Sequence, residues 1–190
     1  YHYLFNKNNG DTRMTSKLKT DVLETVSGSG TIALTNQLSG MTSASMPSGS
    51  VLQVVCAKYS TQVTSTSATL SDTGLTATIT PTSTSSTILV SVHQNAPFIS
   101  DDNNANDIGI RLYRGSSEIS RLASELGYTN SSHYSTTATV STSYLDSPST
   151  TSATTYKTKF ANPDGGAAGG YVRVQNATNE STITLMEIKG

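Results

Sequence analysis

Acidic and amide side chains gather in the stretch His93 to Asp107, which reads HQNAPFISDDNNAND. Three of its residues fall at alternate positions, as the first ligands of an EF-hand calcium loop do: Asp102, Asn104 and Asn106. The match then fails, because Asp107 stands where that loop needs glycine and Tyr113 where it needs a bidentate glutamate. Asn and Asp also favour turns on their own account. The stretch therefore predicts a solvated loop, with a weak ion or ligand site as the alternative.

The other polar residues form no recognisable catalytic frame. A glycosidase needs two carboxylates at a defined separation, and no such frame recurs among these: Asp101, Asp102, Asp107, Glu118, Glu125, Asp146 and Asp164. None of the 30 serines stands in a GxSxG motif. The histidines, His2, His93 and His133, have no cysteine or histidine at metal-ligand spacing. We therefore expect no enzyme, no catalytic residue, no metal and no cofactor.

Two stretches combine hydrogen-bonding groups with aromatic side chains: His93 to Asp107, and Gly127 to Tyr134. An aromatic ring beside Asn and Asp can stack on a sugar and bind its hydroxyls. These two stretches supply the residues that we predict to bind a ligand or receptor, if the protein has one: Asn95, Asp101, Asp102, Asn103, Asn104, Asn106, Asp107, Tyr128, Asn130, His133 and Tyr134. The glycine-rich loop after Asn162 offers few side chains and ranks third.

The strands that must hold these loops begin near Pro47. Val51 to Val55 is a short apolar run, which predicts a strand buried on much of both faces. Cys56, the only cysteine, is expected to be a buried thiol in that strand. In the next strand Leu75, Ala77 and Ile79 alternate with threonines, so one face packs and the other meets water. Pro81 ends it, and Ile88 to Val92 returns towards the core.

The rest of the chain continues at strand spacing. Ile108 to Leu112 and a return through Ile119 form a hairpin with Gly115 at its tip, followed by a loop from Arg121 to Tyr134. Further strands are expected at 137–145, 154–160, 171–175 and 182–188. Short strands at this spacing predict an all-β, antiparallel β-sandwich, jelly-roll-like, over residues 47–190.

Residues 1–46 have a different composition, with scattered apolar residues between glycines. So little apolar area cannot form a core alone. We expect an extended N-terminal arm or neck that packs on copies of itself in a homotrimer. Because the chain begins at Tyr1 rather than methionine, we also expect it to be part of a longer protein.

Composition narrows the function classes. The formal net charge is -1 and the pI about 6.3, which disfavours nucleic acid as a partner. The sequence contains no run of eighteen apolar residues, so we expect no membrane insertion. Ser and Thr fill 61 of 190 positions, and threonine suits a half-buried pleated surface. Such a composition is typical of extracellular and virion β proteins.

Five segments together resemble the C-terminal domain of tailed-bacteriophage virion fibres, a type common in marine and cyanobacterial phages: Pro47–Val55, Ser71–Val92, Arg111–Ile119, Ser143–Lys157 and Ser181–Ile188. Their order and spacing agree, and they cover most of the chain from Pro47 onwards. The shared motifs are strand and turn residues, so the resemblance carries over no binding residues.

The resemblance implies a structural protein of the virion, usually trimeric, whose β-sandwich head lies at the tip of a fibre. Its expected partners are copies of itself, other fibre, tail or capsid proteins, and a host cell-surface glycan or protein. Two alternatives stay open: a capsid-decorating fibre, and a carbohydrate-binding or adhesin module of a secreted bacterial protein. The absence of tryptophan, a common platform for sugars, lowers the last reading.

Overall fold

The computed structural model describes residues 45–100, 106–129, 135–163 and 170–190. All of them belong to one compact unit, Met41–Gly190. The predicted arm, residues 1–46, lies almost wholly outside the described residues, so the arm and its boundary stay predictions. No described helix is long and apolar enough to cross a membrane.

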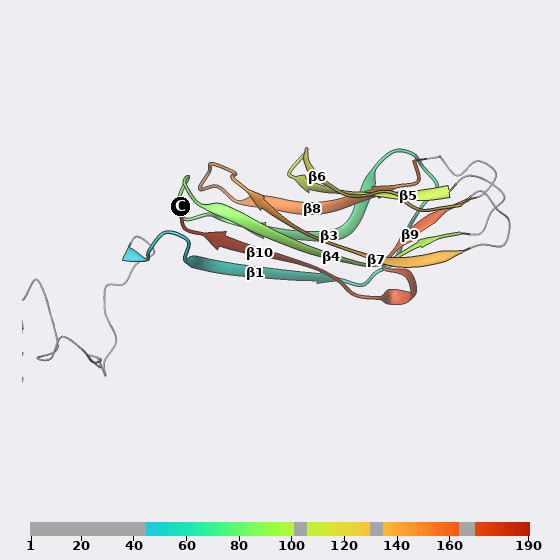
Figure 1. Ribbon diagram of the computed structural model, residues 1–190, viewed down its shortest axis with the longest axis horizontal. Coiled ribbons are helices and arrows are strands. Elements are labelled where there is room, and N and C mark those ends of the chain that lie inside the picture. Colours follow the sequence, from blue (N-terminus) through green and yellow to red (C-terminus); the bar gives the residue numbers. More distant parts are fainter. Residues whose placement is uncertain (1–44, 101–105, 130–134, 164–169) are drawn as a thin grey trace, which may run out of the picture. The chain divides into compact units, whose positions relative to one another are not determined.

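The described strands form two antiparallel sheets that pack face to face (Figure 1). The first sheet contains β1 (Val51–Tyr59), β10 (Ser181–Ile188), β4 (Thr87–Ile99), β9 (Val172–Val174) and β2 (Val63–Ser65), in this order, with β7 (Thr136–Asp146) paired along β4. The second sheet contains β3 (Ser71–Ile79), β8 (Thr154–Ala161), β5 (Asn106–Arg114) and β6 (Ser117–Thr129), in this order.

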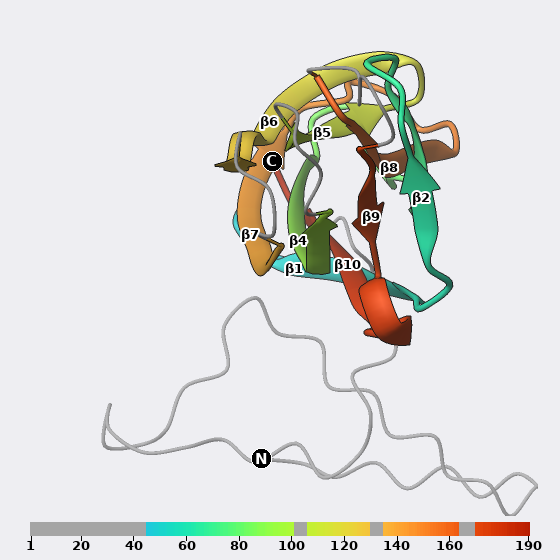
Figure 2. The same cartoon turned by 90° about the vertical axis from the view of Figure 1, so that its right-hand side faces the viewer.

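The chain passes back and forth between the sheets, from β2 to β3, β3 to β4, β4 to β5, β6 to β7, β7 to β8 and β8 to β9. Figure 2 shows β1, β10, β4 and β7 on one side of the interior and β5, β6 and β8 on the other. This alternation is typical of jelly rolls. The predicted all-β antiparallel sandwich is therefore confirmed.

Strict alternation in β8 shows why these residues form strands. Every second residue is buried between the sheets: Thr154, Tyr156, Thr158 and Phe160. Lys157 and Lys159, which lie between them, point to the outer face. The strand expected at 154–160 is therefore confirmed.

Buried apolar side chains form two clusters between the sheets. The first contains Leu75, Ala77, Ile79, Ile88, Val90, Val92, Leu112, Tyr156, Ile183 and Leu185. The second contains Ile99, Ile108, Ile110, Val140, Phe160, Val172 and Val174. On the inward face of β8 a single polar residue, Thr158, lies between Tyr156 of the first cluster and Phe160 of the second.

A chain of buried hydrogen bonds joins the two sheets at that level. Thr158 Oγ1 lies 2.6 Å from Thr73 Oγ1 and donates to Gln94 Oε1 at 2.9 Å. Gln94 Nε2 and Gln175 Nε2 each donate to Ser181 Oγ at 3.1 Å. Because unpaired buried polar groups are costly, these bonds hold β3 and β8 of the second sheet opposite β4 and β10 of the first.

A second buried polar group ties the β5–β6 turn to the sandwich. Asp146 accepts from Arg114 Nη1 at 2.9 Å and from the Tyr156 hydroxyl at 2.6 Å. Burial raises the pKa of the Tyr156 phenol, and its hydrogen bond to Asp146 raises the pKa further. The turn also pairs with β8, because Gly115 N donates to Thr155 O at 2.8 Å.

Two sequence-based expectations about loops were wrong. Residues His93 to Ile99 are not a loop, because β4 pairs with β7 through Ile99, with a bulge between Asn95 and Phe98. Likewise β6 runs to Thr129, so the loop expected from Arg121 to Tyr134 is strand throughout its described part, 121–129. Pairing with neighbouring strands overrides the local preference of Asn, Gln and Gly for turns.

The first strand is exposed on one face rather than buried on both. Val51 is 47% and Val54 55% exposed. Cys56 shares the face of Val54 and is exposed, so the expectation of a buried thiol was wrong. The reason is that only the alternate residues Val55, Ala57 and Tyr59 pack on the core.

Candidate ligand-binding site

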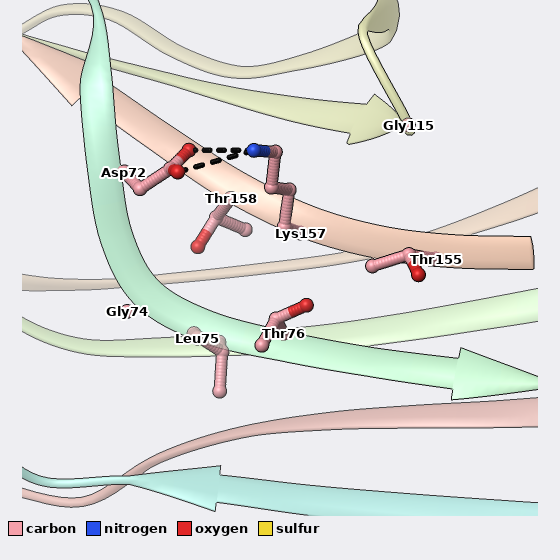
Figure 3. Close-up of a pocket in the computed structure, with 8 residues that line it drawn as sticks. All are labelled: Asp72, Gly74, Leu75, Thr76, Gly115, Thr155, Lys157 and Thr158. Carbon is pink, nitrogen blue, oxygen red and sulfur yellow. Dashed lines mark hydrogen bonds and ion pairs between the residues drawn. The ribbon is translucent and has the colours of Figure 1, made fainter.

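A pocket opens on the outer face of the second sheet, where β3 separates from β8. Asp72 pairs with Lys159 and Thr76 with Lys157, so three residues of β3 face a single residue of β8. The resulting cavity has a volume of about 470 Å³, within the range of roughly 300–1,000 Å³ typical of small-molecule sites. Its lining residues are Asp72, Gly74, Leu75, Thr76, Gly115, Thr155, Lys157 and Thr158 (Figure 3).

The bend in β3 depends on Thr73 and Gly74. The Thr73 side chain turns inward, accepts a hydrogen bond from Leu75 N at 3.1 Å and joins the buried polar chain. Gly74 has φ +87°, a conformation that residues with a Cβ rarely adopt, and an added Cβ would overlap the ring of Tyr59. Figure 3 shows β3 curving away from β8 between Asp72 and Thr76. Glycine is therefore what allows the pocket to form.

One carboxylate and two ammonium groups meet at the rim of the pocket. Lys157 Nζ lies 3.1 Å from both carboxylate oxygens of Asp72, and Lys159 Nζ lies 3.8 Å from Asp72 Oδ1. The Asp72 side chain is 54% exposed, whereas the two lysines are about half as exposed. Lys159 also lies over the Tyr113 ring, with Nζ 5.0 Å from its centroid.

These groups can bind a polar ligand. The carboxylate accepts hydrogen bonds and the ammonium groups donate them. The Thr76 hydroxyl already donates to Tyr156 O at 3.2 Å, so it can only accept from a ligand, and the Thr155 hydroxyl is hydrogen-bonded to Thr78 Oγ1 at 2.8 Å. A polyhydroxylated ligand such as a sugar presents both kinds of partner. Asp72 is the one carboxylate among the residues that line the pocket, so the pair that glycoside hydrolysis uses is not assembled there.

No family model matches the chain. No curated protein matches it either.

The predicted receptor-binding residues are placed as follows. Asn106 and Asp107 lie at the start of β5 and are 0% and 1% exposed, so the expectation that they contact a receptor was wrong. Asn106 Oδ1 instead accepts from Asn162 Nδ2 at 2.7 Å inside the sandwich. Asn95 lies in β4, half-buried, where its side chain accepts from Thr139 Oγ1 at 3.0 Å.

The other predicted residues lie wholly or partly outside the described part of the structure. Tyr128 lies in β6, but its side chain is outside the described part of the structure. The following lie outside the described residues altogether: Asp101, Asp102, Asn103, Asn104, Asn130, His133 and Tyr134. Within the described ranges, no group of three or more His, Cys, Asp or Glu side chains could hold a metal ion.

Phe98, which belongs to the stretch His93 to Asp107, lies in a cluster with Tyr171 and Arg173. The Arg173 guanidinium lies 4.3 Å from the ring centroid of Tyr171 and 5.6 Å from that of Phe98. The two rings are 6.1 Å apart and tilted by 31°. Because each ring already packs against Arg173, the cluster presents less free aromatic surface than a sugar platform needs.

Sequence reasoning missed the pocket residues Asp72 and Lys157. Two signals were present: Gly74 within a strand pattern, which indicates a bulge, and Lys157 alternating with buried residues of β8. Neither signal indicates that β3 pairs with β8. Their pairing is a long-range contact that periodicity does not encode.

Proposed function

We propose that the chain forms the head of a tailed-bacteriophage virion fibre and that this head attaches to a host cell-surface glycan. The observation that carries the proposal is the outer-sheet pocket beside Asp72 and Lys157, held between paired strands. A site on strands is held more rigidly than one on loops, which lowers the entropy lost on binding. The resemblance of five segments to fibre domains supports the virion as the location.

In this proposal the glycan binds by replacing the ion pair between Asp72 and Lys157 with hydrogen bonds from those two side chains to sugar hydroxyls. The ion pair between Asp72 and Lys157 is partly exposed to water, and exposed pairs contribute only about 0–1 kcal/mol. Sugar hydroxyls can therefore replace it at little cost, donating to the carboxylate and accepting from the ammonium group. Specificity would come from the threonine hydroxyls that surround these two charges.

In this proposal the protein works as a homotrimer. Residues 1–46 form the neck and associate near the threefold axis, and the heads present their pockets outward. Neighbouring fibre, tail or capsid proteins join the neck. No step requires a cofactor, a metal or a nucleic acid.

The location is tested by labelling the parent particles with antibodies against the purified chain and imaging them in negative stain. We expect the antibodies, which carry gold particles, to bind at the tips of the tail fibres. Label spread over the capsid would replace this location with a capsid-decorating fibre. Label on bacterial cell surfaces in cultures free of particles would overturn the virion proposal in favour of a secreted adhesin or carbohydrate-binding module.

A further inference from the structure

A row of apolar side chains crosses the outer face of the first sheet. Directly opposed residues of antiparallel strands share a face, and the register places Val54 beside Met186, Met186 beside Leu89, and Leu89 beside Leu145. Val54 is 55% and Leu145 59% exposed. With the adjoining pair from β1 and β10, the apolar patch consists of Val51, Val54, Leu89, Leu145, Met186 and Ile188.

The rows beside the apolar patch are polar but almost uncharged. The next row contains Cys56, Thr184, Ser91 and Ser143. The row after it contains Lys58, Thr182, His93 and Ser141, and a shallow depression of about 460 Å³ lies over the last two rows. The Lys58 charge is met by Glu180, whose Oε1 lies 2.8 Å from Nζ.

We infer that this face of β1, β10, β4 and β7 is an interface between copies of this chain. A partner chosen by charge would find little here to recognise, whereas a neutral face meets its own copy without like-charge repulsion. The exposed apolar row supplies the driving force, since contact removes it from water.

The face is also large enough for a stable contact. Four strands about 4.8 Å apart, over the 8 residues of β10 at about 3.4 Å each, span roughly 520 Å². Two neighbouring copies that each bury this face remove roughly 1,000 Å² from water in total, about the area that a specific interface needs. The pocket lies on the outer face of the other sheet and stays open in such an assembly.

The inference rests on the proposed homotrimer only for the number of copies. Its test uses the full 190-residue chain, with Val54→Glu and Leu145→Glu as variants. Ser124→Glu is the matched control, because it adds the same charge at an exposed strand position in the second sheet. Light scattering over a dilution series measures assembly, and the rate at which a maleimide labels Cys56 measures burial of the face.

We expect the parent chain to be an assembly in which Cys56 reacts at least about tenfold more slowly than in the denatured chain. Each face variant should dissociate at concentrations about tenfold higher or more and label correspondingly faster, because a buried unpaired carboxylate opposes contact. Ser124→Glu should match the parent. Circular dichroism checks folding, and Leu145→Thr, which keeps β propensity, should show the same direction of change if a glutamate variant fails to fold.

Two results would overturn the inference, and they have different consequences. A parent assembly that neither face variant loosens, with Cys56 freely labelled, would remove the interface and leave the homotrimer to residues 1–46. A parent chain that is a monomer at micromolar concentration would remove both the interface and the proposed homotrimer.

Discussion

Replacing Gly74 with alanine is expected to lower the free energy of unfolding by about 3 kcal/mol. Backbone strain at φ +87° contributes about 1–2 kcal/mol of this. The new methyl group also overlaps the Tyr59 ring, and such overpacking typically costs 1–3 kcal/mol. Urea denaturation followed by circular dichroism measures the change. Because Gly74 lies in the bend of β3 beside the pocket, the variant should also lose ligand affinity there.

Gly49→Ala separates the two contributions to this cost. Gly49 has φ +84°, close to that of Gly74, but nothing lies within 4 Å of an added Cβ. The control should therefore lose only the backbone part, about 1–2 kcal/mol. Equal losses in the two variants would show that the Tyr59 ring does not restrict β3, and would contradict this explanation of the bend.

Replacing Glu187 with glutamine is expected to cost about 2 kcal/mol at neutral pH. Glu187 is fully buried, and its carboxylate accepts from Thr82 N at 2.7 Å, from Thr82 Oγ1 at 2.8 Å and from Gln53 Nε2 at 2.6 Å. Glutamine offers one acceptor in place of two, so a donor would face a donor. The loss is measured by urea denaturation at a series of pH values.

The cost of this substitution should depend on pH. Burial alone would raise the pKa of Glu187, but the hydrogen bonds from Gln53 and Thr82 outweigh it and hold the pKa below its ordinary value. The stability that the carboxylate contributes is therefore present above about pH 4 and is lost as the pH falls through the lowered pKa. Below that range the difference between parent and variant should shrink.

Glu180→Gln is the matched control for Glu187→Gln. Glu180 is about half exposed and pairs with Lys58 at the surface, so its loss should cost less than about 1 kcal/mol. If Glu187→Gln costs no more than this control, or if its cost is the same at all pH values, the buried carboxylate has a smaller role than its contacts indicate.

Strands with regular alternation could be predicted from the sequence. Leu75, Ala77 and Ile79 in β3, and the pattern around Tyr156 in β8, each match one buried and one outer face. These strands follow from local periodicity, because one side must leave water. The sandwich class follows from their number and spacing.

The polar interior could not be predicted in the same way. Gln94 reads as a loop residue, yet it is fully buried because Thr158 and Ser181 reach it from other strands. Its partners are 64 and 87 residues away in sequence. The same holds for the pocket, where Asp72 and Lys157 are 85 residues apart. Long-range pairing decides both, and no local pattern contains it.

Glycan binding by the full chain tests the proposed site most directly. A glycan array identifies a ligand, and titration then compares the parent with Asp72→Ala and Lys157→Ala. Arg121→Ala is the control, since Arg121 is an exposed, ion-paired cation on the same sheet. We expect both pocket variants to bind about tenfold more weakly or worse, each having lost charge-assisted hydrogen bonds, while the control binds like the parent. Binding that is unchanged in both pocket variants, or no binding to any glycan, would contradict the proposed attachment site.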